Sequence, residues 1–177
     1  SGVAWSRHEI PLPIHDVNRL VSLGEGNTPC VKLPSLQKVL GLQHLYAKLE
    51  FCNPTGSFKD RGTAIMMSML QEHKATEIVE DSSGNAGASV AAYSARAGIK
   101  AHIFVPANAP PTKLQQIKIY GAQIHLVDGS REDVTQAAIT YCTERDLTYA
   151  SHTLSPYFLE GIKSFAYEAT KQIAIHH

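Results

Sequence analysis

A lysine stands in the first turn of an expected helix. Residues 53–62, Asn-Pro-Thr-Gly-Ser-Phe-Lys-Asp-Arg-Gly, lead from a loop into a helix expected over 58–73. Ser57 and Asp60 have the spacing of a capping box. The positive end of the helix dipole disfavours an ammonium group there and favours the neutral amine, which attacks aldehydes. Lys59 is therefore a candidate nucleophile. The alternative is an exposed lysine whose charge Asp60 balances.

A second loop is rich in hydroxyl, amide and glycine groups. Residues 82–87, Ser-Ser-Gly-Asn-Ala-Gly, lie between an expected strand over 77–80 and an Ala-rich helix over 85–97. Free backbone amides at such a junction bind a carboxylate or a phosphate. Asn85 adds a side-chain donor toward a neighbouring ring oxygen. The alternative is simple helix capping, for which these residue types are common. The loop matches neither the P-loop nor the Gly-x-Gly-x-x-Gly spacing.

The elements that position these loops alternate along the chain. Helix starts are indicated by Ser130 to Asp133 and by Ser155-Pro156, and a helix end by Gly98. Strands that alternate with helices through short connections form a parallel sheet with right-handed crossovers. We expect an α/β fold with an open parallel sheet covered by helices, whose ligands lie beyond the carboxyl ends of the strands. The expected strands cover 45–49, 77–80, 101–105, 123–127 and 148–150, and the other helices cover 111–120, 131–145 and one final stretch from 156 onward.

Composition narrows the possible partners and sites. Sixteen basic residues balance sixteen acidic ones among 177, so charge favours neither a nucleic-acid nor a membrane partner. No apolar stretch approaches the roughly 20 residues that span a bilayer. The three cysteines are far apart, which predicts no disulfide framework, no structural zinc site and a cytoplasmic location. The nine histidines are scattered apart from His176-His177, so we expect no metal site.

Four segments resemble the threonine synthases, a branch of the fold-type-II enzymes that use pyridoxal 5'-phosphate (PLP). They are 23–29, 53–62, 82–86 and 156–163, and they follow in the family's order over about residues 20–170. Residues 53–62 are closer to threonine synthases than to the cysteine synthase or tryptophan synthase branches. The resemblance implies a PLP-dependent lyase that performs replacement or elimination on an amino acid, with conversion of O-phosphohomoserine to threonine as the leading candidate.

The resemblance also implies site roles. Lys59 would hold PLP through a Schiff base and move protons at the substrate's alpha and gamma carbons. Phe58 would pack beside the cofactor, and Asn85 would donate to its phenolic oxygen. Asp60 and Arg61 would brace the loop. The substrate carboxylate would be received by Ser82, Ser83 and the amides of Gly84, Asn85 and Ala86, and Thr153 matches a serine that the family uses nearby.

The sequence departs from the family near its end. Phe158 stands where threonine synthases typically have an arginine that reaches the substrate phosphate, and His152 stands where an asparagine is usual. An aromatic ring does not make the bidentate contact that phosphate favours. A relative with another substrate, similar to threonine or serine dehydratases or to cysteate synthases, therefore stays open. Poor turnover of O-phosphohomoserine is expected, with partial recovery in Phe158→Arg.

The chain is also shorter than members of the family. We expect residues 1–30 to belong with a larger domain, 31–150 to form the small α/β domain, and 151–177 to begin the larger domain again. Both ends resemble artefacts of truncation. The family's later half supplies the glycine-rich cup for the PLP phosphate and the partner of the pyridine nitrogen. These residues alone are expected to fold without catalysing, with an exposed apolar stripe on the final helix. The full-length protein is expected to be a homodimer.

Two rival functions come from other classes. One is a catalytically silent module that keeps the fold for oligomer contacts. The other is a binding domain that takes an amino-acid carboxylate at 82–86 without chemistry. Cofactor colour separates them from the enzyme, because only a lysine-bound cofactor predicts a visible absorption band.

Overall fold

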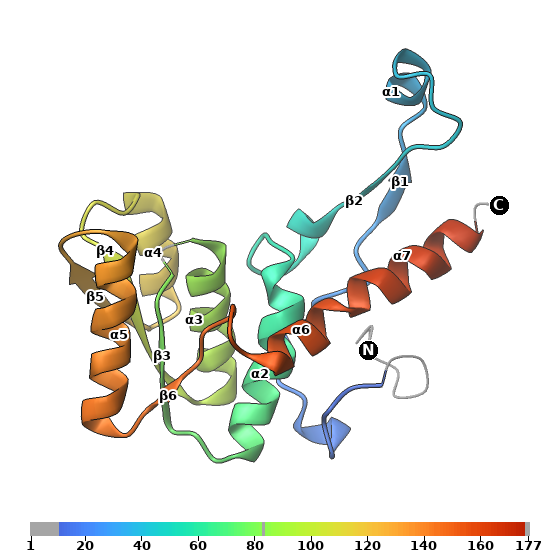
Figure 1. The fold of residues 1–177 in the computed structure, drawn as a ribbon. Helices are drawn as coiled ribbons and strands as arrows, with labels where there is room; N and C mark the ends of the chain where they lie inside the picture. Colours follow the sequence, from blue (N-terminus) through green and yellow to red (C-terminus); the bar gives the residue numbers. More distant parts are fainter. Residues whose placement is uncertain (1–10, 83, 176–177) are drawn as a thin grey trace.

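The core of the protein is a four-stranded parallel sheet. The computed structural model describes residues 11–82 and 84–175 (Figure 1). The strands β3 (Glu77–Glu80), β4 (Lys100–Pro106), β5 (Gln123–Val127) and β6 (Thr148–Tyr149) lie in the order β5-β4-β3-β6, and every neighbouring pair is parallel. The expected open parallel sheet is confirmed.

Helices cover both faces of this sheet. On one face, α2 (Lys59–Glu72), α3 (Asn85–Ala97) and α4 (Pro111–Ile119) enclose the main core with Ile78, Ile103 and Val105. On the other face, α5 (Arg131–Arg145) packs on Val79 and Phe104. Neighbouring strand residues alternate between the two clusters because successive side chains of a strand point to opposite faces.

Local signals placed several helix ends correctly. Ser130 and Asp133 form the expected capping box at the start of α5. Gly98 ends α3 in the left-handed region at φ 71°, where glycine avoids a Cβ clash.

Within the described residues, no helix is long and apolar enough to cross a membrane.

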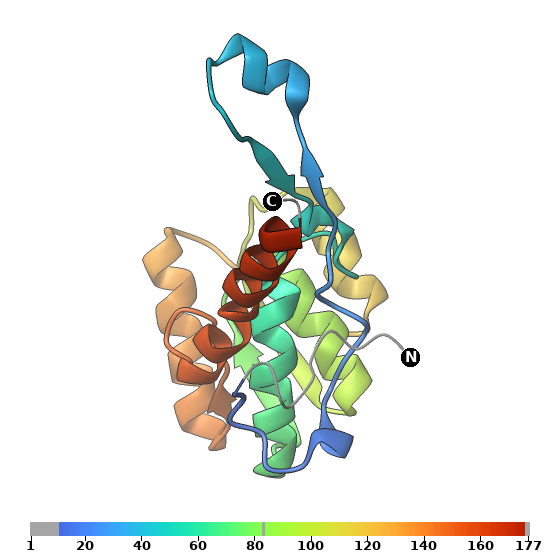
Figure 2. The same cartoon turned by 90° about the vertical axis from the view of Figure 1, so that its right-hand side faces the viewer.

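The strand expected over 45–49 does not join the parallel sheet. It forms β2 (Tyr46–Lys48), which pairs antiparallel with β1 (Cys30–Lys32) in a separate ribbon. This ribbon carries α1 (Pro34–Val39) at its tip and projects away from the sheet (Figure 2). Strands buried on both faces of a parallel sheet need near-continuous apolar residues. All three residues of β2 are only half-buried, and one of them, Lys48, is charged, which explains the different pairing.

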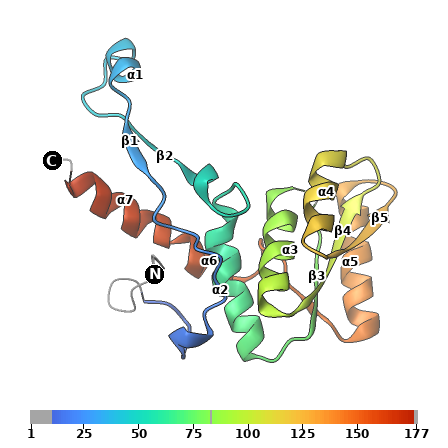
Figure 3. The ribbon, with the colours of Figure 1, turned by 180° about the vertical axis from the view of Figure 1, so that it is seen from behind.

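The single final helix that the sequence suggested is two helices. They are α6 (Pro156–Ile162) and α7 (Ser164–Ile175), and α7 runs out on the same side as the ribbon (Figure 3). Ser155 caps α6 as expected, since its side chain accepts from the amide of Phe158. The α6 segment docks on α2, where a Cβ at Gly161 would lie 2.1 Å from the carbonyl oxygen of Arg61. This close approach sets the direction of α6 and separates it from α7.

The break also changes the apolar stripe. The α6 residues that are buried are Phe158 and Gly161, which were not part of the expected stripe. Of the expected positions, Leu159, Phe165 and Ala166 are exposed, whereas Ile162, Ala169 and Ile173 are half-buried. The prediction of one continuous exposed stripe is therefore wrong.

Two short 3-10 helices, η1 (Val17–Arg19) and η2 (Glu50–Cys52), complete the described elements.

Candidate active site

The N-terminal halves of α2 and α3 lie side by side. Ser89 Oγ of α3 donates to Asp60 Oδ1 at 2.7 Å and lies 2.9 Å from Thr63 Oγ1, and both partners are on α2. Lys59 is the first residue of α2 and Asn85 the first of α3. The α3 helix follows the carboxyl end of β3, which is the edge where ligands of parallel sheets bind. The fold thus brings the two loops selected from sequence to neighbouring positions.

Lys59 is half-buried between aromatic rings. Its Nζ lies 5.1 Å from the centroid of the Phe58 ring and 5.5 Å from that of Phe158. Burial lowers the pKa of Lys59, and the nearby Glu80 carboxylate acts in the opposite direction. Within residues 11–82 and 84–175, Lys59 has no ion-pair partner. A lysine amine with a lowered pKa is more often neutral, which is its nucleophilic form.

Asp60 does not balance Lys59, and the expected capping box is wrong. The carboxylate of Asp60 is fully buried and accepts from the amide and hydroxyl of Thr55 and from Ser89 Oγ. Burial raises the pKa of Asp60, although these hydrogen bonds favour the ionised form. Ser57 Oγ accepts from the amide of Lys59 at 3.3 Å, and the cap of α2 has no side-chain hydrogen bond of the box type. Asp60 instead connects the loop at Thr55 to Ser89 of α3.

A buried carboxylate and a histidine stand behind the Lys59 site. Glu80 is fully buried at the end of β3. It holds His152, whose Nδ1 lies 2.7 Å from Glu80 Oε1 and whose amide donates to Oε2 at 3.3 Å. Burial raises the pKa of Glu80, and the hydrogen bond with His152 opposes that shift. Sequence reasoning did not select Glu80, and the signal that it overlooked was a glutamate placed directly after the apolar pair Ile78 and Val79.

The ring of Phe158 lies against both His152 and Lys59. Its ring packs edge-on against the His152 ring at 5.6 Å between centroids, and it is only 2% exposed. It also lies on Gly62, where an added Cβ would come within 2.6 Å of the ring. Phe158 is therefore a packed wall of the Lys59 site.

The loop before α3 is held close to its own helix. A Cβ at Gly87 would lie 1.8 Å from the carbonyl oxygen of Ser82, so this position requires glycine. Ser82 is half-buried and its Oγ accepts from the amide of Gly84 at 3.3 Å, but the N-cap of α3 is Gly84 and has no side-chain cap hydrogen bond, so the loop is not a simple side-chain cap. The amides that follow, at Asn85 and Ala86, belong to the first turn, which has no intrahelical acceptors. Ser83 lies outside the described residues.

Helix α4 connects the two loops, and sequence reasoning missed this. Lys113 Nζ donates to Asn85 Oδ1 at 2.7 Å and to Gln116 Oε1 at 3.4 Å. Gln116 Nε2 donates to the carbonyl oxygen of Thr55 at 3.2 Å. The spacing of Lys113 and Gln116 on one helix face was available from sequence, but nothing local indicated which loops they meet.

Thr153 lies at the margin of this arrangement. It is exposed in the connection between β6 and α6, and its hydroxyl pairs with that of Ser151 at 2.9 Å. The adjacent His152 is the member of this connection that reaches the Phe158 ring.

Arg61 anchors the turn that carries Lys59. Its guanidinium is fully buried; Nε donates to Glu50 at 2.7 Å, and Nη1 and Nη2 each donate to Glu168 at 2.8 Å. Burial opposes the charge, but the bonds with Glu168 and Glu50 raise the pKa of Arg61. Ser164 and Thr28 complete the contacts. Arg61 thus connects α2 to η2 and α7.

These residues suit a carbonyl cofactor with an aromatic ring. A half-buried amine of lowered pKa lies near two aromatic rings, and the adjacent helix α3 begins with Asn85 and its first-turn amides. In the described part of the chain, no group of His, Cys, Asp and Glu is arranged to hold a metal ion.

The family model described as pyridoxal-phosphate dependent enzyme matches residues 21–177. The chain belongs to this family. Among curated relatives, it is 40% identical to a threonine synthase of Bacillus sp. (strain ULM1) over 92% of this chain and 46% of that protein. It is 39% identical to a threonine synthase of Methanocaldococcus jannaschii over 92% of this chain and 40% of that protein. The chain thus spans less than half the length of these relatives.

Solved structures of other enzymes share the fold. Maize serine racemase aligns with a TM-score of 0.78 and 30% identity, over 84% of this chain and 45% of that one. Diaminopropionate ammonia lyase of Escherichia coli aligns with a TM-score of 0.82 over 88% of this chain and 50% of that one. The latter is 19% identical, so it supports the fold alone.

Proposed function

We propose that this chain is part of a PLP-dependent lyase of the threonine synthase kind, acting by replacement or elimination on an amino acid. The observation that carries the proposal is the amine of Lys59, which is half-buried between the rings of Phe58 and Phe158 with a lowered pKa. The identity to threonine synthases supports the same class.

The chain's residues divide the work around the cofactor. When bound, PLP supplies an electron sink for charge that develops on the substrate. Lys59 would hold the cofactor covalently and would move protons at the alpha and gamma carbons of the substrate. Phe58 would pack beside the cofactor ring, and the side-chain amide of Asn85 would donate to its phenolic oxygen. The substrate carboxylate is bound by Ser82, Ser83 and the amides of Gly84, Asn85 and Ala86, with Thr153 offering a hydroxyl to the substrate.

The leading substrate is O-phosphohomoserine, and one observation favours a second candidate. Phe158 is a buried wall of the Lys59 site and has no charge to offer a phosphate. Arg61 is committed to Glu50 and Glu168. These contacts support a related lyase or synthase that takes an amino acid without a phosphate, of the threonine or serine dehydratase kind or the cysteate synthase kind.

The proposal extends to the whole protein. Residues 31–150 would form a small domain, which is supported by the parallel sheet lying wholly within that range, and 1–30 and 151–177 would belong to a larger domain. A cytoplasmic homodimer is proposed for the full-length enzyme, as the resemblance to threonine synthases implies.

Borohydride reduction tests the central assignment. The full-length protein is loaded with PLP, reduced, digested and mapped by mass spectrometry. The pyridoxyl group is expected on Lys59. Lys48 and Lys113 serve as internal controls, because Lys48 is paired with Glu168 and Lys113 with Asn85. A label on either control lysine in place of Lys59, or no label anywhere, contradicts the proposal.

A further inference from the structure

The side-chain amide of Asn85 already accepts one hydrogen bond through its carbonyl oxygen. Lys113 Nζ lies 2.7 Å from Asn85 Oδ1, across the gap between α4 and α3. An ammonium group has three donors and no acceptor, so it pairs only with the carbonyl end of an amide. The contact with Lys113 therefore determines that the carbonyl oxygen of Asn85 faces α4. With Lys113 in place, the NH₂ group of Asn85 is the end left to face a ligand.

The position of Lys113 is itself fixed by the loop that carries Lys59. Lys113 Nζ also donates to Gln116 Oε1 at 3.4 Å, and Gln116 Nε2 donates to the carbonyl oxygen of Thr55 at 3.2 Å. Thr55 in turn donates to the buried carboxylate of Asp60, next to Lys59. A continuous chain of hydrogen bonds therefore runs from the first turn of α2 through α4 to Asn85.

We propose that Lys113 is a positioning residue that fixes the amide of Asn85 with its NH₂ group toward the cofactor's phenolic oxygen. The inference rests on the proposed function, because it assumes that PLP is held at Lys59 beside Asn85. An acceptor oxygen on the ring requires a donor, and the contact with Lys113 makes Asn85 that donor. Gln116 holds Lys113 at the correct distance from the Lys59 loop.

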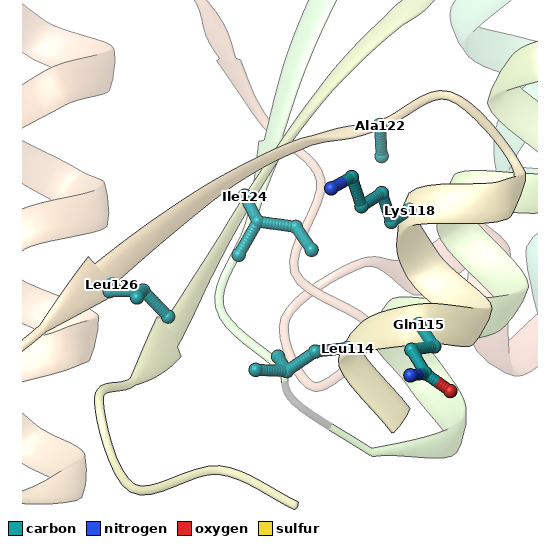
Figure 4. Close-up of a pocket in the computed structure, with 6 residues that line it drawn as sticks. All are labelled: Leu114, Gln115, Lys118, Ala122, Ile124 and Leu126. Atoms are coloured by element: carbon teal, nitrogen blue, oxygen red, sulfur yellow. The ribbon is translucent and has the colours of Figure 1, made fainter. Parts of the chain in front are cut away.

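Four substitutions separate this role from a general effect on α4. Lys113→Met removes the donor at similar length, Lys113→Arg keeps a side chain that only donates, and Lys113→Glu introduces one that accepts. Lys118→Met is the matched control on the same helix. Figure 4 shows Lys118 beside Leu114 and Ile124, at an apolar hollow between α4 and β5. Circular dichroism and thermal unfolding of each variant verify that α4 is retained.

Two measurements on the full-length protein provide the readout. The first is the apparent dissociation constant of PLP, determined by equilibrium dialysis. The second is the pH midpoint of the visible absorption band of the loaded protein. A hydrogen bond that involves a charged group is worth enough to change a dissociation constant about tenfold. We expect Lys113→Met to weaken PLP binding by about that factor and to raise the pH midpoint, because a donor and a positive charge near the phenolic oxygen are lost.

The other variants complete the test. Lys113→Arg and Lys118→Met should stay close to the wild type, and Lys113→Glu should raise the midpoint further than Lys113→Met. If Lys113→Met matches Lys118→Met in both measurements, or if Lys113→Arg loses as much as Lys113→Met, the positioning role is wrong. A wild-type protein that shows no visible band and no label on Lys59 refutes the proposed function instead, so the two failures are distinguishable.

Discussion

Gly62→Ala should disturb the wall of the Lys59 site more than its small size suggests. A Cβ at residue 62 would lie 2.6 to 2.7 Å from three carbon atoms of the Phe158 ring. Favourable carbon contacts lie at about 3.5–4.0 Å, so the ring must retreat by roughly 1 Å. Overpacking of this kind costs about 1–3 kcal/mol, whereas replacing a helical glycine with alanine gains about 1 kcal/mol. Because the ring is also held by His152, we expect a net loss of about 1–2 kcal/mol.

The assay is a double-mutant cycle with Phe158→Leu. Urea unfolding of the wild type, Gly62→Ala, Phe158→Leu and the double variant gives the four free energies. The smaller leucine leaves room for the new methyl group, so the double variant should be more stable than the sum of the single effects predicts, by about 1 kcal/mol. Loading of Lys59 with PLP should fall in Gly62→Ala and partly return in the double variant. Additive free energies within about 0.5 kcal/mol would refute the packing argument.

Three further changes test other parts of the structure. Hydrogen bonds with Arg61 help to hold the pKa of Glu168 at about 2 against an ordinary value of 4.5, although burial opposes that shift. Stability is therefore fully present above pH 4.5 and lost as pH falls toward 2, and Glu168→Gln should remove roughly 3 kcal/mol of this dependence in urea titrations. Burial and the neighbouring His102 lower the pKa of His125, so the free energy of unfolding should fall as pH drops below 6.5. The fall should be smaller in His125→Phe, and an equal dependence of the free energy on pH in both proteins would contradict this. Phe158→Arg should lower the unfolding midpoint, because residue 158 is 2% exposed and a charge there would be buried. The same variant should raise O-phosphohomoserine turnover about ten- to a hundredfold in a phosphate-release assay. Efficient turnover by the wild type would contradict the specificity argument.

Much of the fold follows from local signals in the sequence. The capping box at Ser130, the glycine end at Gly98 and the alternation of apolar runs with amphipathic stretches predicted the elements of the parallel sheet close to their observed bounds. Lys59 and Asn85 were selected because each stands at a helix start. These features depend on residues within one turn of each other, so the sequence carries them directly.

The contacts that complete the site were decided by the tertiary structure. His152 meets Glu80 across 72 positions, and Lys113 meets Asn85 across 28. The capping box expected at Ser57 and Asp60 was lost because Thr55 and Ser89 bind the carboxylate of Asp60 in its place.

Packing also determined what the final segment does. The sequence showed one helical run from residue 156 onward, but Gly161 and Phe158 dock on α2 and Arg61 draws Glu168 into a separate ion pair. Close approach of two helices and burial of a charge depend on the shapes and partners of distant segments. A local periodicity indicates which residues form a helix, whereas the direction of that helix and the residues it buries depend on the surface that the rest of the chain presents.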